Sequence, residues 1–147
     1  MAGAAWSWSA IRAGIAAAIN AGVTDLRCDA HLTDKINPPA CVVAPRRLVY
    51  HVTMGPGVSE IGFAVVILAA GGSERVAQVT LDRYLDPSGP HSVFAAVLAD
   101  PTLGGVVDDT IIDDLDEGSY GRLAWGGVDY WGAALNGRVL ASQGDST

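Results

Sequence analysis

The sequence predicts an α+β fold: an antiparallel or mixed β-sheet of four to six strands, with two main helices packed on one face and a short third helix. Three observations lead to this prediction. Near the start of the chain, apolar residues recur at the spacing of an amphipathic helix. Later segments either alternate between apolar and polar residues or are apolar throughout, which is typical of strands. Short glycine-containing turns separate the last of these segments and favour antiparallel hairpins over long crossovers.

The composition indicates a single domain over residues 1–147, with extended tails expected at 1–8 and 142–147. Half of the residues are apolar and 17% are charged, so the chain can bury a core without covalent or metal support. Cys28 and Cys41 lie 13 residues apart in apolar stretches, outside any Cys-x-x-Cys motif. We therefore expect two buried free thiols.

A first helix is predicted to begin after Ser9, its N-cap, and to run to about Asn20, before Gly22. Its apolar stripe consists of Ile11, Ile15 and Ile19. Arg12 interrupts this alanine-rich start, so a secretory signal is not expected. The longest apolar run is "IGFAVVILAAGG", which is shorter than the ~20 residues that a membrane-spanning helix needs, and no membrane partner is expected.

The middle of the chain is predicted to form strands. A weakly ordered connection leads to Pro38-Pro39, which excludes a helix, and then to a short strand over residues 40–44. Residues 48–54 alternate with period two, as a strand with one buried side would. Residues 58–70 are apolar on both sides from Ile61 onward, which predicts a central strand covered on both faces.

Two helices are predicted next. Ser73 should cap the second helix, whose buried side carries Ala77, Leu81 and Leu85. The short third helix should start at residues 88–90 and end at Asp100-Pro101, because a residue before proline avoids the helical region. Its expected apolar anchors are Phe94, Val97 and Leu98.

Strands over residues 106–115, 120–125 and 128–141 should close the chain, joined by turns at Glu117-Gly118 and Gly126-Gly127. In the last strand, one face should carry Trp131, Ala133, Leu135 and Val139.

The net charge of −7 comes almost entirely from one acidic segment. Its members are Asp108, Asp109, Asp113, Asp114, Asp116 and Glu117. In an extended strand, Asp108 and Asp114 should point to one face, with Asp109 and Asp113 on the other, so their carboxylates should not converge on one ion. The segment also fails the calcium-loop pattern, because its glycine and its expected final glutamate are misplaced. We expect a solvated acidic edge.

The sequence gives little support for a catalytic or ligand-binding site. His31, His51 and His91 are spread over three elements without the spacing of a zinc site. "GGSER" is expected to be a helix start, because the lysine of a phosphate-binding loop is missing. The only adjacent basic pair is Arg46-Arg47, which disfavours nucleic-acid binding as the main task. We predict no catalytic, cofactor-binding or metal-binding residues and no enzymatic activity.

The order of features resembles one known family. The relevant stretches are "INPPACVVAP", "YLDPSGPHSVFAAVLADPTLGGVVDD" and the closing "GGVDYWGAALNGRV". From about Ile36 to Val139, the chain is similar to the small tail-terminator proteins of long-tailed phages that infect actinobacteria. The most telling part is the run from Tyr84 to Asp109, whereas the segment "AGAAWSW" has no counterpart.

The resemblance implies a structural virion protein, made in the host cytoplasm. Such proteins form a ring, usually of six copies, at the head-proximal end of the tail tube. The ring ends tube polymerisation and offers the surface that joins tail to head. The implied partners are further copies of the chain, the major tail tube protein, a head–tail connector or stopper protein, and genomic DNA that passes through the lumen without specific binding.

Two alternatives remain open. One is a head–tail connector or head-closure (stopper) protein of the neck. The other is a small intracellular enzyme or ligand-binding domain that uses His51, His91 and the acids. For a ring, copies must meet through two different patches, which favour exposed aromatics, and Trp6, Trp8 and Trp125 are the candidates. We expect the acidic segment to line the lumen or face the tube, where negative charge would repel DNA.

Overall fold

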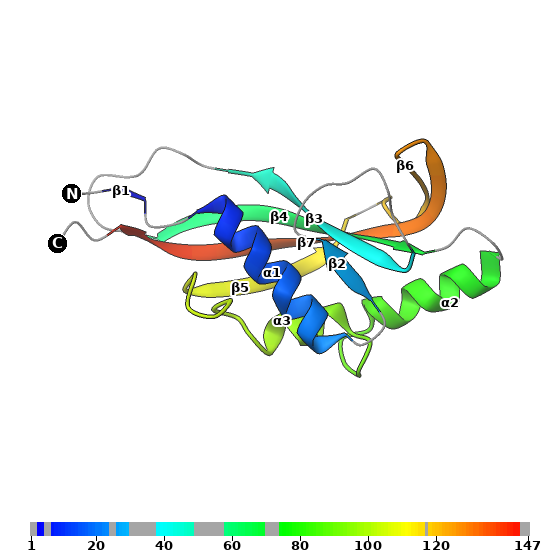
Figure 1. The fold of residues 1–147 in the computed structure, drawn as a ribbon, viewed down its shortest axis with the longest axis horizontal. Helices are drawn as coiled ribbons and strands as arrows, with labels where there is room; N and C mark the ends of the chain where they lie inside the picture. The colour runs from blue at the N-terminus through cyan, green and yellow to red at the C-terminus, as the bar shows by residue number, and fades with distance from the viewer. Residues whose placement is uncertain are drawn as a thin grey trace.

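The structure is a computed structural model that describes most of the chain. The described residues are 3–4, 7–23, 26–29, 38–48, 58–69, 74–116 and 118–144. The strands are β1 (Gly3–Ala4), β2 (Arg27–Asp29), β3 (Ala40–Arg47), β4 (Val58–Ala69), β5 (Asp109–Leu115), β6 (Gly121–Trp125) and β7 (Val128–Gly144). The helices are α1 (Trp8–Gly22), α2 (Glu74–Leu85) and α3 (Val93–Leu98) (Figure 1).

The strands form one mixed sheet in the order β1-β7-β4-β3-β2, with β5 and β6 also paired to β7. β2 and β3 are parallel, and every other neighbouring pair is antiparallel. The longest pairing joins β4 to β7, from Val58 opposite Ser142 to Ala69 opposite Trp131. The α+β prediction is confirmed: β2–β7 make six strands, and two main helices and a short third accompany them.

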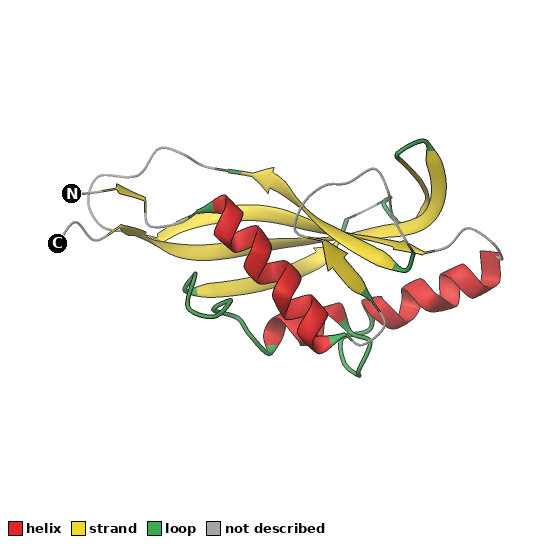
Figure 2. Ribbon diagram, viewed as in Figure 1, coloured by secondary structure: helices red, strands yellow, loops and turns green. Residues whose placement is uncertain are grey.

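The core lies between one face of the sheet and the helices (Figure 2). Alternate residues of β4 point into it, beginning with Ile61 and Phe63, and each of these two is fully buried. β7 contributes Leu135 and Val139. The predicted stripe of α1 is confirmed, because Ile11, Ile15 and Ile19 are all 0% exposed and belong to this core.

The centre of the sheet is too crowded for another side chain. Gly137 of β7 lies opposite Phe63 in the register. A Cβ atom at Gly137 would overlap the edge of the Phe63 ring and would lie 2.7 Å from the backbone oxygen of Ile111 in β5. The Phe63 ring therefore occupies the space that a side chain at position 137 would need.

Several predicted boundaries are wrong by a few residues. Helix α1 starts two residues earlier than expected, because Ser7 is the N-cap and its side chain accepts a hydrogen bond from the Ala10 backbone amide. Helix α3 starts later than residues 88–90. Its N-cap is the buried Ser92, whose hydroxyl accepts from the Ala95 amide and donates to the Asp86 carbonyl.

The buried sides of α2 and α3 also differ from the prediction. In α2, Tyr84 is fully buried and belongs to the core, whereas Leu85 is partly buried and packs against that core. In α3, Leu98 is 60% exposed. Val93 and Ala96 lie in the core beside Val97 because the helix begins later than predicted.

Parts of the predicted connection and tails are in the sheet. β2 was not predicted, and β3 continues past residue 44 through Pro45, where the register with β4 shifts. The last residues of β7 pair with Gly3 and Ala4. The predicted strand over 48–54, apart from Leu48, and the predicted cap Ser73 lie outside the described residues.

The expectation of free thiols is wrong. Cys28 and Cys41 are buried, but they form a disulfide between β2 and β3, where they are direct partners in the register with Cα atoms 4.4 Å apart. The Asn20 side chain fixes the same point of β2: its amide donates to the Cys28 carbonyl (2.9 Å), and its oxygen accepts from the Cys28 amide (2.8 Å). Helix α1 is thus tied to the edge of the sheet.

The crowding at Gly137 gives a first prediction. Gly137→Ala should lower the free energy of unfolding by about 3 kcal/mol, because the new methyl group must displace Phe63 or the β5 backbone. Chemical denaturation of the purified variant measures this. Gly62→Ala is the matched control: it lies in β4, where an added Cβ would meet Arg47 at an ordinary 3.4 Å. Equal losses for the two variants would contradict the steric account.

Candidate interaction site at the β5 edge

Strand β5 places the acidic segment at the edge of the sheet. It pairs with β7 on one side, with Asp109 opposite Leu140 and Asp114 opposite Asn136. Between Ile112 and Asp114 the register shifts by a β-bulge, which puts two residues of β5 where an uninterrupted strand has one. The alternation of side chains is broken at this point.

The bulge contradicts the prediction that Asp114 points to the face opposite Asp109 and Asp113. Asp109 and Asp114 oppose residues of β7 that point away from the helices, so both lie toward the helix-free face. Asp113 reaches the same face, where its Oδ1 accepts from Arg138 Nε at 3.2 Å. Asp109, Asp113 and Asp114 are therefore on one face, whereas a regular strand would have placed Asp114 opposite the other two.

Few cations offset this charge. Arg138 contacts Asp113 and also approaches Glu60 Oε2 at 3.6 Å, and the Asn136 amide donates to Asp116 Oδ1 at 3.3 Å. The Arg138 and Glu60 side chains are 40% and 61% exposed, so these pairs add little stability, about 0–1 kcal/mol each. Their main effect is to orient the side chains. We call Glu60, Asp109, Asp113, Asp114 and Asp116 the acidic face; Arg138 is the cation that contacts it.

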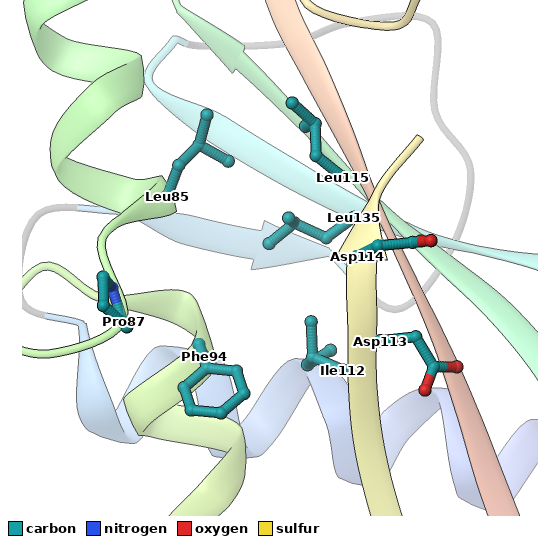
Figure 3. Close-up of a pocket in the computed structure, with 8 residues that line it drawn as sticks. All are labelled: Leu85, Pro87, Phe94, Ile112, Asp113, Asp114, Leu115 and Leu135. Atoms are coloured by element: carbon teal, nitrogen blue, oxygen red, sulfur yellow. The ribbon is translucent and has the colours of Figure 1, made fainter. Parts of the chain in front are cut away.

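An apolar groove runs along the helix side of β5. A hollow of about 300 Å³ lies between the end of α2, helix α3 and β5. Its apolar lining is Leu85, Pro87, Phe94, Ile112, Leu115 and Leu135 (Figure 3). Asp113 and Asp114 border it, but in Figure 3 their carboxylates point away from Leu85 and Phe94. A smaller hollow of about 130 Å³ shares Phe94 and Ile112 and extends the groove toward Leu98.

Two polar contacts join α2 to the β6 end of the sheet. The Tyr120 hydroxyl donates to Asp82 Oδ1 at 2.8 Å, and Arg122 lies 4.0 Å from Glu74. The Arg122 guanidinium also stacks over the Trp131 ring, 5.8 Å from its centroid. Burial and the neighbouring Asp82 carboxylate raise the pKa of Tyr120 from 10.0 to about 12. The two carboxylates in these contacts, Glu74 and Asp82, both belong to α2.

The predicted interface aromatics do not form one cluster in the described residues. Trp8 is the first residue of α1, is half-buried and packs against the core. Trp125 is the last residue of β6 and is also half-buried. Trp6 and Glu117 lie outside the described residues, and the role of these side chains in an interface stays a prediction.

The described residues form no histidine cluster and no metal site. His91 meets Tyr84 edge to face, with ring centroids 6.5 Å apart, and His31 and His51 are not among the described residues. Within the described ranges, no three His, Cys, Asp or Glu side chains are placed to hold a metal ion. Glu60 and Arg138 were not predicted from the sequence as site residues. Arg138 is next to Val139, which was predicted to face the core, so strand alternation places Arg138 on the opposite face.

The comparisons with known proteins do not indicate a function for the site. No protein-family model matches the sequence, and no curated protein matches it either. In the part of the chain that the structure describes, no helix is long and apolar enough to cross a membrane.

The Tyr120–Asp82 contact predicts a pH dependence. The unfolded chain loses this proton near pH 10, whereas the folded chain keeps it to about pH 12, so stability should fall as the pH rises between these values. Tyr120→Phe should remove that part of the slope, measured by denaturation at several pH values. In Asp82→Asn, ultraviolet absorbance should show the Tyr120 hydroxyl ionising at lower pH than in the wild type. An unchanged slope in Tyr120→Phe would contradict the assignment.

Proposed function

We propose that this chain is a structural protein of a long-tailed phage that assembles into a ring, of six copies by analogy, at the head-proximal end of the tail tube. There it ends tube polymerisation and provides the surface to which the head's connector binds. The proposal starts from the resemblance of the segment between Tyr84 and Asp109 to tail-terminator proteins. In the fold, this segment forms the end of α2, the whole of α3 and the entry into β5.

The observation that carries the proposal is the acidic face. The bulge in β5 and the register with β7 gather Asp109, Asp113 and Asp114 on the helix-free side, beside Glu60. In a ring whose lumen is lined by this face, each copy would add several negative charges to the wall. DNA passing through would be repelled and would slide without binding, since such charges act over about 8 Å at physiological salt.

The distribution of exposed apolar side chains also supports an assembled protein. Val76 and Val79 on α2 are 64% and 55% exposed, and Leu98 and Leu115 at the groove are 60% and 40% exposed. The two valines lie on α2, whereas the two leucines lie on α3 and β5. A closed ring of identical copies needs this arrangement, because one patch must meet a different patch on the next copy.

The proposal predicts a length phenotype. Deleting the gene from the phage should give tails of uncontrolled length, because nothing would stop the tube protein from polymerising. Electron microscopy of lysates measures the length distribution, and supplying the gene from a plasmid should restore it. Tails of normal length that fail to join heads would contradict the terminator role and favour the connector or stopper.

A further inference from the structure

The outer side of α2 carries an apolar and basic stripe. Arg75, Val76, Val79 and Arg83 are all exposed and fall on one side of the helix, because their spacings of one, three, four and seven residues keep them within about a quarter of its circumference. The opposite side holds Ala77, Leu81 and Tyr84 in the core. We call these four exposed residues the α2 stripe.

The α2 stripe carries two arginines, and the two acids of the helix contact residues of the β6 region. Glu74 pairs with Arg122, and Asp82 accepts from Tyr120, and both contacts face the β6 end of the molecule. The stripe itself combines two exposed valines with two arginines. A surface of this kind fits a partner that is apolar in the middle and acidic at the rim.

The groove at β5 has that complementary character. Phe94, Ile112 and Leu115 give it an apolar floor, and Asp113 and Asp114 lie at its β5 border, with their carboxylates directed toward the acidic face. Asp114 is exposed, and so is Asp113 even though it contacts Arg138. The dimensions also agree: Val76 to Arg83 spans about 10 Å along a helix, and Ile112 to Leu115 spans about 10 Å along a strand.

We propose that the α2 stripe of one copy docks in the β5 groove of the next copy. Val76 and Val79 would cover Ile112 and Leu115, and Arg75 would approach Asp114. A chain cannot make this contact with itself, because the other side of α2 is fixed in its own core. The interface is heterologous, so repeating it gives a closed ring or an open chain of copies. This inference rests on the proposed function only for the place where the chain assembles. It adds to that function the two surfaces through which copies of the chain associate.

A charge exchange between two variants tests this pairing. Arg75→Asp and Asp114→Arg should each weaken self-association of the purified chain at least about tenfold, because each places like charges on the two sides of the contact. In an equimolar mixture, the acidic stripe of one variant meets the basic groove of the other, and association should return to near the wild-type level. Sedimentation over a range of concentrations measures this.

Two further variants complete the design. Val79→Asp should weaken association through loss of the apolar contact. Arg46→Asp makes the same charge change as Arg75→Asp at an exposed position on β3 and should have no effect. Circular dichroism confirms that each variant is folded.

The outcomes separate the interface from the function. A wild-type chain that stays monomeric at hundreds of micromolar, single variants that associate as the wild type does, or a mixture that fails to recover would each overturn the pairing. If the variants behave as expected but a phage that lacks the gene still makes tails of normal length, the terminator role is contradicted and the interface is supported. If the deletion lengthens tails but genes encoding Asp114→Arg or Arg75→Asp restore normal length, the interface is wrong and the role stands.

Discussion

Strand β7 is the constraint on which the rest of the structure depends. It pairs with β4 along one edge and with β5 and β6 along the other, and its end also pairs with β1. A single strand therefore sets the register of both halves of the sheet. The close approach of Phe63 to Gly137 lies in the middle of this arrangement, and β5 passes the same point, because a Cβ at Gly137 would also meet the Ile111 carbonyl oxygen.

The position of the acidic face follows from that register. With β7 fixed by β4, the partners of β5 decide which way its carboxylates point, and the bulge after Ile112 turns Asp113 and Asp114 to the same face. Arg138 of β7 lies between Asp113 and Glu60 and so connects acids of two strands that do not pair with each other. The groove lies on the other side of the same edge, between the end of α2, helix α3 and β5.

Periodicity predicted the parts of the fold that depend on burial. The isoleucine stripe of α1, the central strand β4 and the shared face of Trp131, Ala133, Leu135 and Val139 follow from it, because a buried face repeats with the period of its element. Periodicity missed what depends on partners distant in sequence. The bulge in β5, the parallel pairing of β2 and the disulfide between Cys28 and Cys41 are set by neighbouring strands, and no local pattern encodes them.

The central claim is that copies of this chain form a ring with the acidic face on its lumen. A cryo-electron microscopy reconstruction of the head-proximal end of isolated tails tests it most directly. The account predicts a ring of this fold in which Asp109, Asp113 and Asp114 line the channel and α2 of each copy contacts β5 of the next. A ring of this fold with those carboxylates on its outer wall, or tails that end without such a ring, would contradict it.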